Sequence, residues 1–249
     1  MILMYHHVCS SDEIPLAQVP LEGWKYKLEP AAFESQLRAI LARGYRFVTL
    51  KAYLAEMAIG GSLFSTLATV TFDDGWLDNF TNAFPILTRL DIPATFFVVS
   101  GEMQGISWDR RMTPDQLKLL LASGMTIGAH TRSHPNLASL DHWALRDEVY
   151  GAKLDLERLT GVPVEYLAYP GGRFSQKVVQ AAQDAGYLAA CSVINWGQNT
   201  EASRYWLYRD VFRDRLDGLS DKLRLNQWTR RMFGGRAKRS LQKMLARDV

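Results

Sequence analysis

The feature that most constrains the fold is an alternation of short apolar runs with amphipathic segments, repeated about seven times along the 249 residues. The runs at 68–72 and 94–99 are rich in β-branched and aromatic residues, and the second is apolar on both faces. Between such runs lie stretches with helical spacing, such as the one that Pro30 opens and Gly44 ends. Since no linker or repeat interrupts the pattern, we expect one α/β domain, either a (β/α) barrel or a doubly wound sheet.

Five residues with reactive or polar groups follow predicted strands directly. They are His6, Asp73, Asp74, His130 and Tyr169. In a (β/α) barrel, the C-terminal ends of the strands form the catalytic face. We therefore expect these residues to lie near one another.

The aspartate pair stands in Thr71-Phe72-Asp73-Asp74-Gly75-Trp76. Side chains alternate faces along a strand, so both carboxylates can face one cleft only if the strand ends there, and Gly75 supplies a turn. Taken alone, the pair is most simply a strand-to-helix turn in which one aspartate caps a helix that begins near Trp76.

A histidine pair changes that interpretation. His130 and His134 are separated by three residues, and a helical turn would place both imidazoles on one face, within reach of one metal ion. Two imidazoles and one carboxylate form a catalytic metal site with an open position. Zinc suits these ligands best, and cobalt, nickel and manganese are alternatives.

The net charge of +3 hides an asymmetry. Residues 219–249 contain nine Lys or Arg against two acidic residues, a balance of +7, so residues 1–218 carry −4. We expect 1–218 to form the barrel and 219–249 a basic helical extension. Such a segment can contact an anionic membrane surface, or it can be a solvated helix or a frayed terminus. A nucleic-acid partner is not expected.

Signals for export and membrane insertion are not found. The N-terminus lacks a basic region followed by an apolar one, and no run of eighteen apolar residues occurs. The two cysteines, Cys9 and Cys191, are too few for a disulfide scaffold. We expect a cytoplasmic protein, with the basic extension as the route to membrane association.

Three motifs resemble signatures of the polysaccharide deacetylases, the family four carbohydrate esterases. They are Thr-Phe-Asp-Asp-Gly at 71–75, His-Thr-Arg-Ser-His-Pro at 130–135 and Ala-Tyr-Pro-Gly-Gly at 168–172. The resemblance implies a distorted (β/α)7-type barrel and metal-dependent removal of acetyl groups from N-acetylated sugars. By motif position it implies that Asp73 is the general base, and that the backbone N–H of Tyr169 stabilises the oxyanion. The implied metal ligands are Asp74, His130 and His134.

The general acid departs from the commoner pattern, in which a Leu-x-His motif near the C-terminus supplies it. No histidine follows His142. The opening Leu3-Met4-Tyr5-His6-His7-Val8 resembles that motif moved to the front, as in the circularly permuted branch that includes poly-N-acetylglucosamine deacetylases. The resemblance implies His6 as the acid, with His7 as the alternative or as a packing residue.

The arginine that usually precedes the third motif is missing at 166–168. Arg209 resembles the late arginine of the permuted branch and would pair with Asp73; a solvated arginine on an edge strand is the alternative. Trp76 and Trp196 would line a sugar-binding groove or belong to the core.

The expected function is therefore metal-dependent N-deacetylation of N-acetylhexosamine residues in a polysaccharide or glycan precursor, with a lipid-linked saccharide as one candidate. A glycoside hydrolase using Asp73 or Asp74 is a first alternative, but it leaves the histidine pair unexplained. A catalytically silent carbohydrate-binding barrel is the second.

Overall fold

The computed structural model describes residues 1–10, 27–60, 62–101, 111–195 and 197–211. The expected basic extension and Trp196 lie outside these residues. The strands are β1 Ile2–Tyr5, β2 His7–Val8, β3 Lys27–Leu28, β4 Arg46–Phe47, β5 Leu67–Phe72, β6 Ala94–Val98, β7 Thr126–Ala129, β8 Tyr166–Ala168, β9 Ala189–Cys191 and β10 Asp210–Val211. The α-helices are α1 Pro30–Leu41, α2 Leu50–Ile59, α3 Phe84–Arg89, α4 Pro114–Ala122, α5 His142–Arg146, α6 Ala152–Thr160 and α7 Gln176–Asp184.

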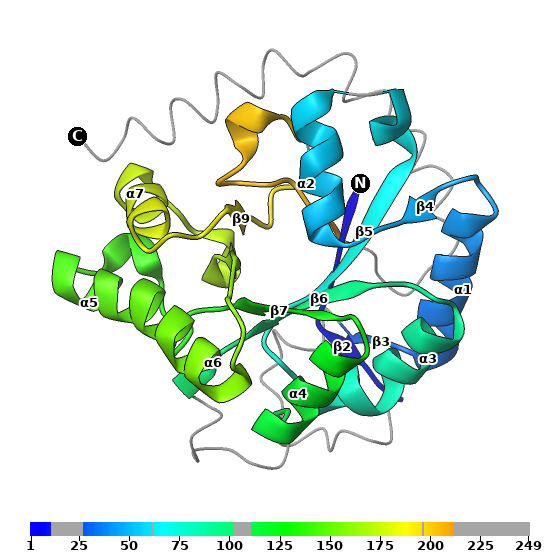
Figure 1. Ribbon diagram of the computed structural model, residues 1–249, viewed down its shortest axis with the longest axis horizontal. Helices are drawn as coiled ribbons and strands as arrows, with labels where there is room; N and C mark the ends of the chain where they lie inside the picture. The colour runs from blue at the N-terminus through cyan, green and yellow to red at the C-terminus, as the bar shows by residue number, and fades with distance from the viewer. Residues whose placement is uncertain (11–26, 61, 102–110, 196, 212–249) are drawn as a thin grey trace.

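The main sheet is parallel and follows the order β10-β1-β5-β6-β7-β8-β9, with β4 pairing the start of β5. Leu207 pairs with Cys191 in β9, and β10 pairs with β1, so residues 207–211 join the two ends of the curled sheet. Figure 1 shows the helices around the outside of these strands. The expected distorted (β/α)7-type barrel is confirmed, and its strand ends form one common edge.

The strand that leads to the aspartate pair is buried along its whole length. All residues of β5 and β6 are buried, as expected for central strands of a parallel sheet that is covered on both sides. Phe72 of β5 and Phe96 of β6 stack with ring centroids 4.9 Å apart. Burying a side chain of this size contributes about 1.5–3 kcal/mol, so the end of β5 is held in a fixed position.

Helix starts limit the strands that precede them. β4 spans only Arg46–Phe47 of the strand-like run 45–50, because the Thr49 hydroxyl accepts a hydrogen bond from the Ala52 N–H and begins α2. Thr113 and Gln116 form the capping box of α4, as the Thr-Pro sequence predicts. In the described part of the chain, no helix has both the length and the apolar character needed to cross a bilayer.

Candidate active site

Asp74, His130 and His134 converge on one point at the carboxyl edge of the sheet. The Nε2 atoms of His130 and His134 lie 3.4 Å and 3.5 Å from the same carboxylate oxygen, Asp74 Oδ1. Two ligands about 2.0–2.1 Å from a tetrahedral zinc lie about 3.3 Å apart, so these separations match a shared cation better than direct hydrogen bonds. The donor set therefore fits a divalent metal of the zinc type.

The histidine pair is not on a helical turn, and that expectation is wrong. Residues 130–135 form an irregular turn in which Thr131 and His134 have left-handed φ values of 66° and 58°. The Thr131 hydroxyl accepts a hydrogen bond of 3.0 Å from the His134 N–H. This local bond holds the turn, which brings the two rings to a centroid separation of 4.9 Å.

The tautomer of His130 follows from its partner. Its Nδ1–H donates to the Ala168 carbonyl at 2.8 Å, which leaves the Nε2 lone pair directed at Asp74. Backbone partners of this kind fix the orientation of metal-binding imidazoles. Burial opposes protonation of His130, yet the neighbouring Asp74 and Asp73 raise its pKa, so this pocket favours positive charge.

An ion-pair network that the sequence reading missed anchors the turn. Arg132 Nε and Nη2 donate to Asp155 at 2.7 Å and 3.0 Å, and the N–H groups of Arg132 and Ser133 donate to Glu148. A Cβ on Gly151 would lie 2.7 Å from the Arg132 guanidinium, so a larger residue there would displace the guanidinium from Asp155. The sequence feature that could have predicted this network is the spacing of Glu148 and Asp155, which lie two helical turns apart.

Asp73 is buried and paired with Arg209. The guanidinium makes two hydrogen bonds to the carboxylate, at 2.7 Å and 2.6 Å, and its Nε donates to the Ser192 carbonyl at 2.8 Å. Burial raises the cost of ionising Asp73, but the Arg209 charge outweighs it and keeps the pKa of the carboxyl below its usual value. The expected pairing is present, and the alternative of a solvated arginine is wrong, because Arg209 is only 1% exposed.

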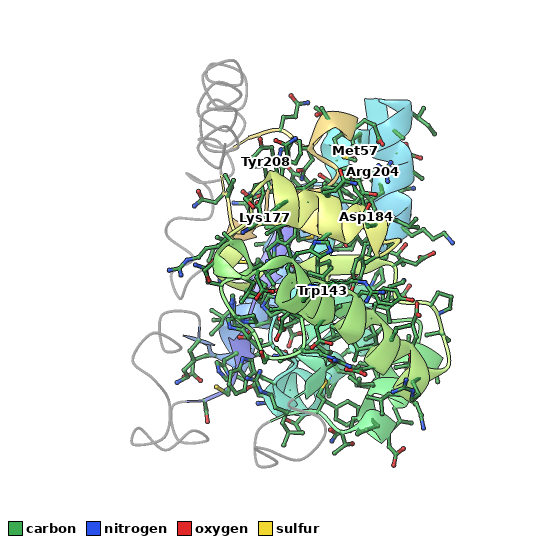
Figure 2. All side chains as sticks on the ribbon, turned by 90° about the vertical axis from the view of Figure 1, so that its left-hand side faces the viewer. Met57, Trp143, Lys177, Asp184, Arg204 and Tyr208 are labelled. Carbon is green, nitrogen blue, oxygen red and sulfur yellow. The ribbon has the colours of Figure 1, made fainter. Side chains whose placement is uncertain are left out.

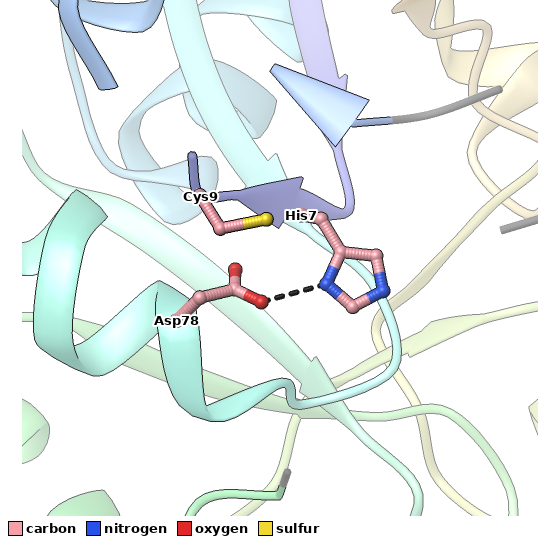
Figure 3. Close-up of side chains that lie close together, drawn as sticks. All are labelled: His7, Cys9 and Asp78. Atoms are coloured by element: carbon pink, nitrogen blue, oxygen red, sulfur yellow. Dashed lines mark hydrogen bonds and ion pairs between the residues drawn. The ribbon is translucent and has the colours of Figure 1, made fainter. Parts of the chain in front are cut away.

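His6 and His7 lie in different environments. Burial lowers the pKa of His6, while the Asp73 and Asp74 charges oppose that shift, which places His6 within electrostatic reach of both carboxylates. His7 turns to Asp78 instead, with Nδ1 2.6 Å from Oδ2 (Figure 3). His7 is therefore a buried packing residue, and His6 stays the predicted acid.

Tyr169 cannot supply the expected oxyanion donor. Its N–H donates to the Cys191 carbonyl at 3.0 Å within the sheet, and its hydroxyl donates to the Tyr205 carbonyl at 2.8 Å. The N–H of Gly171, two residues later, makes no hydrogen bond to another described residue, and Gly171 is an exposed residue. The register between β8 and β9 determines that the Tyr169 N–H is used in the sheet and the Gly171 N–H is not. The sequence does not predict this register.

Comparisons with known proteins agree with this geometry. A family model described as polysaccharide deacetylase matches residues 65–190, just over half of the chain. The structure of the Streptococcus pyogenes deacetylase PplD in complex with acetate is 27% identical, with a TM-score of 0.73 over 85% of this chain and 91% of that one. The Bacillus subtilis protein YxkH is 24% identical over 84% of this chain and 69% of its own length. A peptidoglycan-N-acetylglucosamine deacetylase of Bacillus cereus is 27% identical over 70% of this chain and 60% of its own length.

Proposed function

The chain belongs to the polysaccharide deacetylase family, and we propose that it is a metal-dependent N-deacetylase acting on N-acetylhexosamine residues of a polysaccharide or glycan precursor. One observation carries this proposal: Asp74 Oδ1 faces two imidazole nitrogens at metal-sharing distances, next to the Asp73 carboxylate that Arg209 keeps ionised. The PplD structure holds acetate, the product of such a reaction, which supports the same activity here. Family membership also favours deacetylation over glycoside hydrolysis.

The described residues divide the work of amide hydrolysis. A divalent cation held by Asp74, His130 and His134 would polarise the acetamide carbonyl and make a nearby water more acidic. Asp73 accepts the proton of the attacking water, because its carboxylate is ionised and directed by two hydrogen bonds. His6 donates a proton to the departing amine, and the Gly171 N–H stabilises the oxyanion.

Acetate release from N-acetylglucosamine oligomers and peptidoglycan fragments tests the proposed function. Chelated protein should release none, and added zinc or cobalt should restore release, because the cation polarises the carbonyl. His134→Ala should lose both metal binding and activity. Glycan cleavage that resists chelation would instead indicate the glycoside hydrolase, and sugar binding without turnover in metal-loaded protein would indicate the silent barrel.

His6 and His7 provide a matched pair for the acid role. His6→Gln should lower acetate release by about 10²–10⁴-fold, the usual contribution of a positioned acid. His7→Gln should cost much less, since His7 Nδ1 contacts Asp78 rather than the site carboxylates. Steady-state kinetics of both metal-loaded variants check this assignment, and a larger loss for His7→Gln would reverse it.

The proposal also includes the identity of the metal, a membrane contact and a lipid-linked substrate. Zinc is the preferred metal for two imidazoles and a carboxylate. The basic composition of 219–249 supports peripheral membrane contact in a cytoplasmic enzyme that acts on a lipid-linked saccharide. Equal flotation with anionic liposomes by the full chain and by residues 1–218 would exclude that contact.

A further inference from the structure

Trp76 contacts the carboxylate oxygen of Asp74 that does not face the histidines. Its indole Nε1–H donates to Asp74 Oδ2 at 3.0 Å, while Oδ1 faces His130 and His134. The two oxygens of one carboxylate thus have separate partners. A metal bound on the histidine side would meet Asp74 through Oδ1, because Oδ2 is already occupied by a donor.

Two side chains pack against the Trp76 indole ring. The Arg111 guanidinium carbon lies 3.6 Å from the centroid of the indole ring. The centroid of the His7 imidazole lies 4.3 Å from that of the indole, and the two ring planes are inclined by 33°. Arg111 Nη1 also donates to the Asp74 backbone carbonyl, so the same arginine holds both the indole and the chain that carries the ligand. A cation–π contact of this kind holds the indole and the guanidinium together.

His7 is itself fixed by a hydrogen-bonded partner. Its Nδ1 lies 2.6 Å from Asp78 Oδ2, and the other carboxylate oxygen accepts the Val8 N–H at 2.8 Å. Cys9 stands beside this pair, as Figure 3 shows, and the three residues include metal-binding atom types. The separation of 2.6 Å is that of a charge-assisted hydrogen bond and is shorter than the distance between two ligand atoms of one tetrahedral zinc ion. Asp78 therefore orients the His7 ring rather than sharing a second metal with it.

We propose that Trp76 is a positioning residue for the metal site, which holds Asp74 Oδ2 through its indole N–H and leaves Oδ1 as the single metal-binding oxygen. Arg111 and His7 fix the plane of the indole and therefore the direction of that N–H. This inference rests on the proposed metal site and adds to it a residue that acts through Asp74 rather than as a metal ligand. It also gives Trp76 a role different from both the sugar-stacking and the core alternatives.

Trp76→Phe is the direct test, because phenylalanine keeps an aromatic ring that can contact Arg111 and His7 but has no N–H donor. Loss of an outer partner of a metal ligand weakens metal binding by about 10–100-fold, and we expect a loss of that size. Zinc affinity of the metal-free protein, measured by competition with a chromophoric chelator, is the readout. The absorption spectrum of the cobalt form should change as well, since a freed Oδ2 can add to the coordination shell.

Trp143→Phe is the matched control. Trp143 lies on α5 and is 75% exposed, on the side of the molecule where α7 presents Lys177 and Asp184 (Figure 2). The Trp143→Phe variant should bind zinc with the same affinity as the unchanged protein. Zinc affinity of Trp76→Phe equal to that of Trp143→Phe, with an unchanged cobalt spectrum, would overturn the proposal.

A second variant keeps the test decisive if Trp76→Phe does not fold. Arg111→Met removes the guanidinium from the indole face and from the Asp74 carbonyl, and it should also weaken zinc binding; unchanged affinity would contradict the proposal. Failure of the metal site itself gives a different result, because the unchanged protein and His134→Ala would then bind zinc equally. Acetate release is not needed for either conclusion.

Discussion

Asp73→Asn should lower acetate release by about 10²–10⁴-fold in metal-loaded protein, which is the usual contribution of a general base. The amide has nearly the shape of the carboxylate and can still accept a hydrogen bond from Arg209, but it cannot take a proton from water at neutral pH. Metal affinity should change little, because Asp74, His130 and His134 are the groups with metal-sharing geometry. The turnover number and the bound metal per chain are the two measurements.

The matched control for this substitution is Asp184→Asn. Asp184 ends α7 and accepts a hydrogen bond from Gln180 on the surface, so its amide should leave acetate release unchanged. Full activity of Asp73→Asn would contradict the assignment of Asp73 as the base. Loss of metal together with activity would also contradict it, since Asp73 would then act as a ligand.

Much of the fold follows from local patterns. The run that became β6 is apolar on both faces, and a parallel sheet covered on both sides buries such a strand completely. Short strands were harder to bound: β4 ends early because Thr49 caps α2, and that depends on one hydroxyl. Closure through Leu207 and β10 is a long-range pairing that no local pattern encodes.

The candidate site likewise has features that the sequence predicts and features that depend on the folded structure. Residue types and motif spacing placed Asp74, His130 and His134 together, because parallel strands end at one edge. The turn that joins the histidines was not predictable, since left-handed φ values at Thr131 and His134 are uncommon for residues other than glycine. Nor could the sequence show that the Tyr169 N–H is already used in the sheet, because that depends on strand register.

Arg209→Met should destabilise the fold by about 3–5 kcal/mol, the cost of leaving one partner of a buried ion pair uncompensated. Asp73 would remain buried without its two hydrogen bonds from the guanidinium. Arg38→Met is the control, because Arg38 pairs with Glu34 on the surface and exposed ion pairs contribute little to stability. Urea unfolding of the metal-free proteins at neutral pH measures both, and equal losses would contradict the importance of the buried pair.

The pH dependence of this loss gives a sharper test of the cause. Burial disfavours the charged form of Asp73, but Arg209 keeps the pKa of the folded carboxyl below the ordinary value of about 3.9. The pair therefore contributes stability above that ordinary pKa, and the contribution disappears as the pH falls through the lower folded value. Without Arg209, Asp73 can relieve its burial by taking a proton, so the stability deficit of Arg209→Met should shrink as the pH is lowered. In the Asp73→Asn background, the deficit that Arg209→Met causes should no longer depend on pH in that acidic range. A deficit of Arg209→Met alone that does not shrink as the pH falls would instead assign the loss to packing.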